Sequence, residues 1–136
     1  MPSDFNAKVI AEFRANRGQV GGVLADTPII LIHHSGARTR NELIAPLAYM
    51  PQADGRLVIA ASNGGSPAHP AWYLNLEANP EVQVQVKGEK FAARAHTVQG
   101  AERAVLWAKM LEIYGPYAEY QTKTDRQIPV VVLKPV

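Results

Sequence analysis

The chain has 136 residues, of which 47% are hydrophobic and 19% are charged, a balance typical of one folded domain and not of a disordered segment. It contains no cysteine, which excludes disulfides and cysteine-ligated metal sites, and a formal charge of only +2 argues against nucleic acid as a partner. No apolar stretch is long enough to cross a membrane, so we expect a cytoplasmic protein with a single domain over residues 1–136.

The N-terminal segment 1–18 is predicted to form an amphipathic helix. Phe5, Val9 and Phe13 recur every four residues between charged side chains, and Gly18 is a typical helix end. This narrow apolar stripe favours packing over the mouth of a barrel. A peripheral contact with a membrane surface is the alternative.

Alternating or continuous apolar runs predict about six strands. They cover residues 29–34, 43–50, 57–62, 82–86, 91–98 and 128–133. Pro46 indicates that the second strand lies at an edge or contains a bulge, because proline cannot donate a ladder hydrogen bond. Asp54-Gly55 predicts a hairpin between the second and third strands.

Two further helices are predicted, over 71–79 after Pro70 and over 100–115, and the segment 116–127 is expected to bridge to the last strand. The apolar face of the helix over 100–115 is predicted to contain Val105, Leu106, Met110 and Ile113. Mostly consecutive antiparallel strands with added helices predict an α+β fold that is mainly β, built as a small barrel.

The loop Ser62-Asn63-Gly64-Gly65 is the first candidate site. Its glycines allow successive backbone N–H groups to converge on an anion without any charged side chain. An ordinary connecting loop is the alternative.

The turn between the first two strands is the second candidate site. Arg38 and Arg40 flank the hydroxyl of Thr39, and together they can bind phosphate or carboxylate through charge-assisted hydrogen bonds. The alternative is that both arginines are simply solvated in an exposed turn.

The histidines do not predict a metal site. His33 and His34 are adjacent on a strand, so their side chains point to opposite faces and cannot bind one ion. His69 and His96 have no partner at ligand spacing either, so we expect no metal.

Two groups of aromatic residues have different patterns. Trp72 and Tyr73 open the helix over 71–79 and are expected to be core anchors, with stacking on a ligand as the alternative. Tyr114, Tyr117 and Tyr120 are spaced by three residues, which would place them on one helix face. Three adjacent phenols fill a core poorly because each hydroxyl needs a partner, so they indicate a wet pocket wall.

Three segments carry a family resemblance. They read GARTRNELIAPLAY, AASNGGSPAHPAWYLNLEANPEVQVQV and YGPYAEYQTKTDRQIPVVVL, and in this order they resemble the deazaflavin-dependent nitroreductase family over residues 21–136. The most specific part is the pattern WYLNLxANPxVxVQ. The resemblance implies a split β-barrel with an FMN-binding-like fold, and coenzyme F420, an 8-hydroxy-5-deazaflavin, as a hydride carrier. It also implies quinones, nitroaromatics or similar electron-poor rings as acceptors.

The resemblance also assigns expected roles by position. Arg38 and Thr39 correspond to the pair at the cofactor phosphate, and Tyr114, Tyr117 and Tyr120 to the tyrosines on the substrate side. The expected contacts of the deazaflavin and its tail are Pro46, Leu47, Ala61, Ser62, Asn63, Gly64, Gly65 and Trp72.

The sequence departs from the family pattern at three positions. Many relatives have glycine where Arg40 stands, arginine where Leu43 stands and lysine where Asn63 stands. We therefore expect the anionic cofactor tail, with its phosphate and glutamate carboxylates, to be bound through Arg38 and Arg40.

The expected activity is hydride transfer from reduced F420 to a small-molecule acceptor. Ser62 or one of the tyrosines, with Tyr117 first, would stabilise developing negative charge or deliver a proton. Two alternatives remain: an FMN-dependent enzyme of the same barrel class, and a deazaflavin-binding protein without turnover. Both a monomer and a homodimer are compatible with the sequence.

Overall fold

The computed structural model describes residues 4–16, 28–36 and 42–136. Within them the chain forms helices α1 (Asp4–Ala15), α2 (Ala71–Ala78), α3 (Gly100–Ile113) and α4 (Pro116–Thr122), and the short 3-10 helix η2 (Asn63–Gly65). The strands are β1 (Ile29–Ser35), β2 (Glu42–Ala48), β3 (Met50–Pro51), β4 (Leu57–Ala60), β5 (Glu81–Val86), β6 (Glu89–Val98) and β7 (Val130–Pro135). None of the helices in these ranges has the length and apolar character needed to cross a membrane.

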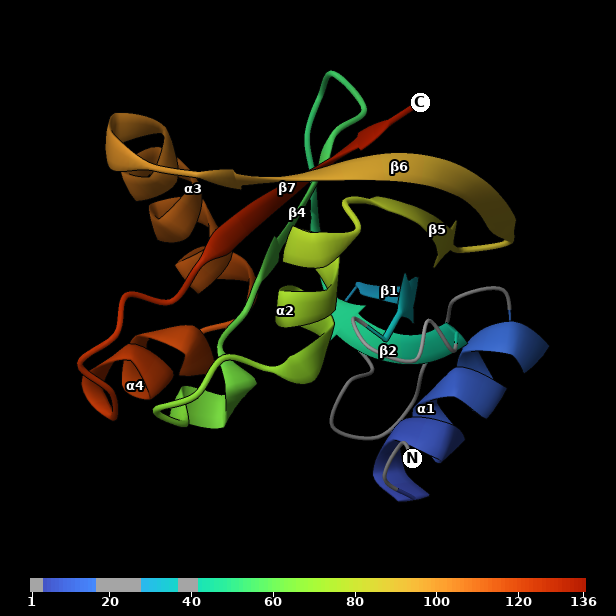
Figure 1. The fold of residues 1–136 in the computed structure, drawn as a ribbon, viewed down its shortest axis with the longest axis horizontal. Coiled ribbons are helices and arrows are strands. Elements are labelled where there is room, and N and C mark those ends of the chain that lie inside the picture. Colours follow the sequence, from blue (N-terminus) through green and yellow to red (C-terminus); the bar gives the residue numbers. More distant parts are fainter. Residues whose placement is uncertain (1–3, 17–27, 37–41) are drawn as a thin grey trace.

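The described strands form one antiparallel sheet of seven strands, in the order β2-β1-β5-β6-β7-β4-β3. The edge strands β2 and β3 are separated in the chain by Tyr49 alone. At about 3.8 Å between successive Cα atoms, this link brings the two edges of the sheet within about 8 Å of each other. The sheet must therefore curl into a barrel that is nearly closed (Figure 1). The predicted split-barrel α+β architecture is confirmed.

The predicted strand 43–50 divides into two, which is why the sheet has seven described strands and not six. β2 pairs with β1 at one edge, whereas β3 pairs with β4 at the other. Pro46 lies in an edge strand, as predicted, opposite Leu31 of β1. The hairpin at Asp54-Gly55 is also confirmed, with Gly55 at a φ of +93°.

β1 is buried from Ile29 to His34 because helices cover both of its faces. Ile29 and Leu31 pack on one face against Val9 and Phe13 of α1, while Ile30 and the other even-numbered residues face the main core with α2. The packing role of α1 is thus confirmed for Val9 and Phe13, on the outer face of β1 and not over a barrel mouth. The side chain of Phe5 lies outside the described residues.

α2 lies inside the curl of the sheet, and α3 and α4 cover the side formed by β4 and β7 (Figure 1). The expectation that Val105 belongs to the apolar face of α3 is wrong, because its side chain is 56% exposed. The buried positions are Arg103, Leu106 and Met110, whose spacing of three and four residues leaves position 105 off that face. The side chain of Ile113 lies outside the described residues.

The segment 116–127, predicted as a bridge, contains α4. Pro116 stands at its start, where a missing N–H costs nothing. α4 places Tyr117 in the second core cluster together with Met110, Ile128 and Val130. This helix also lies beside η2, which brings the tyrosines close to the glycine loop.

Candidate active site

A cavity of about 590 Å³ opens between β2, the end of β4, the start of α2 and the tyrosines around α4. Such a volume lies within the range of small-molecule sites. Its described lining residues are Ile29, Ala45, Pro46, Leu47, Ala48, Ala60, Ser62, Asn63, Pro70, Trp72, Tyr114, Tyr117 and Tyr120. Predicted residues from three distant segments of the chain therefore share one cavity.

The edge strand β2 forms one wall. Four consecutive residues, Ala45–Ala48, line the cavity. Because β2 is an edge strand, this run places the cavity along one edge of the sheet. Pro46 and Leu47, which the sequence analysis selected, are both half-buried in this wall.

The glycine loop forms a second wall through Ser62 and Asn63. Asn63 has a φ of +48° and Gly65 a φ of +86°, so two residues of this short segment are left-handed. A Cβ at Gly65 would lie 2.9 Å from the carbonyl oxygen of Tyr120 and 3.0 Å from the Cβ of Lys123. The observed reason for glycine at position 65 is close packing on α4.

Two other predicted residues of this loop, Ala61 and Gly65, are not among the described lining residues. Ala61 is fully buried and belongs to the main core. Gly65 is buried beside α4, and Gly64 lies within η2. Ala61 and Gly65 thus hold the backbone on either side of Ser62 and Asn63.

Trp72 stands at the first turn of α2, and its side chain is 8% exposed. It contacts Tyr73 edge-on, with ring centroids 6.2 Å apart. Both residues belong to the main core cluster, so their expected role as core anchors is confirmed. Trp72 in addition lines the cavity, whereas Tyr73 does not.

The three tyrosines form the wall opposite β2. The ring centroids of Tyr114 and Tyr117 are 4.9 Å apart, and that of Tyr120 lies 6.4 Å from Tyr114 and 6.3 Å from Tyr117. The expectation of one shared helix face is wrong in detail, because Tyr114 caps α3 while the other two belong to α4. Although the helix is interrupted between Ile113 and Pro116, the three rings remain in contact.

The hydroxyl groups of Tyr114 and Tyr117 remain protonated at neutral pH. A hydrogen bond to Tyr120 and burial raise the pKa of Tyr114 to about 12, and the hydroxyls of Tyr114 and Tyr120 are 3.4 Å apart. Burial, and then the neighbouring tyrosines, also raise the pKa of Tyr117. The phenols of Tyr114 and Tyr117 are therefore available as hydrogen-bond donors.

The Tyr117 hydroxyl has no partner among the described residues. Tyr117 is only 5% exposed as a whole, yet it lines the cavity. An acceptor atom of a ligand in the cavity could therefore take its hydrogen bond.

Arg38, Thr39 and Arg40 lie outside the described residues, so their expected contacts stay predictions. Sequence reasoning missed several lining residues, namely Ile29, Ala45, Ala48, Ala60 and Pro70. Small or apolar residues carry no chemical signal of a site. For Ile29, Ala48, Ala60 and Pro70, only their positions at strand ends and before a helix could have pointed to them.

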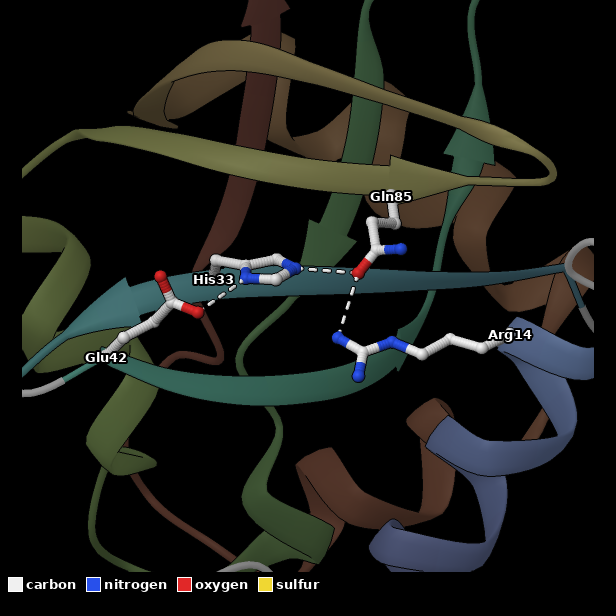
Figure 2. Close-up of polar contacts among 4 residues, drawn as sticks. All are labelled: Arg14, His33, Glu42 and Gln85. Atoms are coloured by element: carbon white, nitrogen blue, oxygen red, sulfur yellow. Dashed lines mark hydrogen bonds and ion pairs between the residues drawn. The ribbon is translucent and has the colours of Figure 1, made fainter.

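The two adjacent histidines lie on opposite faces of β1, as predicted. Nε2 of His33 is 2.7 Å from Oε1 of Gln85, which also accepts from Arg14 at 3.2 Å, and Nδ1 of His33 is 3.0 Å from Oε1 of Glu42 (Figure 2). His34 instead accepts a hydrogen bond from Asn75 of α2 at 3.0 Å. No group of three metal-binding side chains occurs within the described ranges.

The chemistry of the cavity suits a flat, largely apolar ring. Aliphatic side chains of β2 face it from one side and aromatic rings from the other, with a few hydroxyl and amide groups between them. No ionisable acid, base or thiol other than the phenols is among the described lining residues. The described residues of the cavity can thus hold and polarise a flat reactant.

Comparison with known proteins gives a consistent result. The family model described as F420H(2)-dependent quinone reductase matches residues 7–135. The F420H(2)-dependent quinone reductase Rv1261c of Mycobacterium tuberculosis is 38% identical over 127 residues, which are 90% of this chain and 85% of the relative.

Two solved structures are similar throughout. An F420-H2 dependent reductase, FDR-A, is 41% identical with a TM-score of 0.73, and the match covers 84% of this chain and 100% of that one. A structure described as a domain-swapped dimer is 39% identical with a TM-score of 0.74, covering 92% of this chain and 94% of that one. The chain belongs to the F420H(2)-dependent quinone reductase family.

Proposed function

We propose that this cavity binds F420 and that hydride transfer from reduced F420 to a quinone takes place in it. The observation that carries the proposal is that Ser62 and Asn63, Trp72 and the three tyrosines line the same cavity. These segments are far apart in the sequence, and the fold brings the expected cofactor side and substrate side together.

The deazaflavin ring would lie between Pro46 and Leu47 of β2 and the loop 61–65, with Trp72 at its side. The half-buried aliphatic wall fits the apolar face of such a ring, and the backbone N–H groups of Ser62 and Asn63, with the Ser62 hydroxyl, fit its polar edge. Arg38, Thr39 and Arg40 would bind the phosphate and the glutamate tail.

When bound, reduced F420 supplies a hydride, and a quinone that takes up this hydride and one proton becomes a hydroquinone. Negative charge develops on the quinone oxygen during this transfer, and Tyr117 would donate a hydrogen bond to it. The raised pKa of Tyr117 favours this role over that of a proton donor, because a phenol that holds its proton tightly is a weak acid. The hydroxyl of Ser62 is the second candidate donor.

The proposal is tested by titrating the purified protein with F420 and with FMN and then following oxidation of reduced F420 by menadione. We expect binding of F420, weaker or no binding of FMN, and turnover that saturates with the quinone. Preferred binding of FMN would instead support the flavin enzyme of the same barrel class. Tight binding of F420 without turnover on quinones and nitroaromatics would support a binding protein.

The relative described as a domain-swapped dimer supports a homodimer for this chain, which light scattering of the purified protein would test. The single domain over 1–136, the cytoplasmic location and the peripheral membrane contact of α1 stay predictions. Unfolding in a single transition would support the first of these.

A further inference from the structure

Arg126, in the segment between α4 and β7, directs its guanidinium into the glycine loop. Its Nε donates to the carbonyl oxygen of Ser66 at 3.0 Å, and its Nη2 donates to that of Ser62 at 2.9 Å. Its Nη1 donates to the carbonyl oxygen of Ala61 and to Nδ1 of His69, both at 3.2 Å. One side chain therefore binds the loop at its start and at its end.

The backbone around Arg126 is itself fixed. Gln121 of α4 donates to the carbonyl oxygen of Arg126 at 2.8 Å and accepts from the N–H of Ile128 at 3.0 Å. The buried Arg103 of α3 donates to the carbonyl oxygen of Ile128 at 2.6 Å. The backbone that carries the guanidinium is therefore held by α3 and α4, while the guanidinium itself binds the loop, so it can impose a position on the loop.

The loop needs such support because of its backbone conformation. Asn63 and Gly65 both have positive φ, and left-handed residues persist when their surroundings over-determine them. The carbonyl groups of Ser62 and Ser66, on either side of these two residues, both bind Arg126. The guanidinium thus fixes both ends of the left-handed segment.

The carbonyl contacts also determine where the next N–H groups point. The described peptide bonds are trans, so the N–H of each following residue points opposite to its carbonyl group. The carbonyls of Ala61 and Ser62 face Arg126, which turns the N–H groups of Ser62 and Asn63 away from it. These N–H groups have no acceptor among the described residues, and both residues line the cavity, whereas Arg126 does not.

We propose that Arg126 is a positioning residue for the site: by binding the carbonyl groups of Ala61, Ser62 and Ser66, it presents the N–H groups of Ser62 and Asn63 to the ring of the bound cofactor. This inference rests on the proposed function, because it assumes that the ring lies in the cavity. Arg126 acts on the cofactor only through the loop, so its loss weakens cofactor binding and leaves the tyrosine side unchanged.

The test uses Arg126→Met, which keeps the length of the side chain without its donors, and Arg126→Lys, which keeps the charge. Amide exchange in the ligand-free protein reports on the loop through the N–H groups of Gly65 and Ser66, which donate to Ser62 and Asn63. We expect exchange at both to be at least about tenfold faster in Arg126→Met. The Kd for F420 and the KM for reduced F420 should rise about 10- to 100-fold, with the KM for menadione unchanged.

Arg56→Met is the matched control, because the Arg56 guanidinium also donates a hydrogen bond, to Asp54 at 2.8 Å, but does not touch the loop or the segment that carries Arg126. It should leave the Kd for F420 and the exchange at Gly65 within about twofold of the parent. Arg126→Lys should fall between the parent and Arg126→Met, since an ammonium group cannot span three carbonyl oxygens. If Arg126→Met does not fold, the proposal is tested with Arg126→Lys by the same measurements of amide exchange and of the Kd for F420.

A lower melting temperature with unchanged exchange and unchanged Kd in either variant would overturn the proposal and leave Arg126 a purely structural residue. If the parent protein does not bind F420, the proposed function fails instead. In that case the exchange rates of the ligand-free variants still show whether Arg126 holds the loop.

Discussion

Replacing Tyr117 with phenylalanine removes one hydroxyl group from the centre of the tyrosine wall. The ring contacts stay, because Phe fills the same space against Tyr114 at 4.9 Å and Trp107 at 6.0 Å between ring centroids. The hydroxyl has no hydrogen bond to a described residue, so its loss leaves no buried partner unsatisfied. The free energy of unfolding of this variant should therefore lie within about 0.5 kcal/mol of that of the parent.

The expected effect on catalysis is much larger. A donor that hydrogen-bonds the quinone oxygen more strongly as charge develops contributes to the transition state and little to the ground state. Its removal should lower kcat about 10- to 100-fold, which corresponds to about 1.4 to 2.7 kcal/mol. The Kd for F420 should not change, because the hydroxyl lies on the proposed substrate side of the cavity.

Tyr117→Ala separates the ring from the hydroxyl. It removes a side chain that is only 5% exposed, and such a deletion costs about 3 to 5 kcal/mol of unfolding free energy. It should also change the relative kcat/KM values of quinones of different size, because the stacking surface is lost. Tyr49→Phe is the matched control, since Tyr49 is equally buried at 5% and does not line the cavity.

The measurements are urea unfolding, fluorescence titration with F420 and steady-state oxidation of reduced F420 by menadione, made on all three variants. If Tyr117→Phe turns over like the parent and Tyr117→Ala only loses stability, Tyr117 is a core residue. The hydrogen bond to the acceptor would then have to come from elsewhere, with Ser62 as the next candidate.

Three further predictions concern other parts of the site and fold. Gly65→Ala should lower the free energy of unfolding by about 2 kcal/mol or more, because residue 65 is left-handed and a Cβ there would lie 2.9 Å from the carbonyl oxygen of Tyr120. Gly115→Ala, where a Cβ would have open space, should not lower it. Arg38→Ala should raise the Kd for F420 about 10- to 100-fold at low salt and less at high salt, and an unchanged Kd at low salt would contradict the predicted tail contact. Burial lowers the pKa of His34, so the unfolded state takes up a proton at a higher pH than the folded state does. The free energy of unfolding should therefore fall as the pH drops from about 6.5 toward the pKa of the folded state, and it should fall less in His34→Gln.

Local sequence patterns predicted the elements well where a single period dominates. Val82 and Val84 of β5 alternate with glutamine and are both buried in the core, and Pro46 lies in an edge strand. Part of the cavity was also predictable from single residues. Proline, glycine and tyrosine have restricted conformations or partners, so their positions carry information about the chain around them.

Contacts between distant segments were not predictable in this way. Nothing near Arg126 in the sequence indicates that it binds carbonyl groups some 60 residues earlier in the chain. Glycine at position 65 predicts a close approach of some atom, but only the fold shows that the carbonyl group of Tyr120 makes it. Val105 fits an apolar pattern, yet the neighbouring Arg103 takes the buried place because its donors reach the carbonyl group of Ile128.

The charge distribution around the cavity constrains how an anionic cofactor can be bound. The described lining residues carry no cation, so none of them can neutralise a phosphate or glutamate carboxylates. In the chain, Glu42 at the start of β2 directly follows the segment that contains Arg38 and Arg40, and it is three residues before Ala45 of the cavity wall. At about 3.3 Å per residue of strand, Ala45 of the cavity wall lies about 10 Å along β2 from Glu42. If Arg38 and Arg40 bind the anionic tail as predicted, the cofactor must carry its negative charge apart from the ring that fills the described part of the cavity. A ligand with a neutral ring at one end and its negative charge at the other meets both requirements.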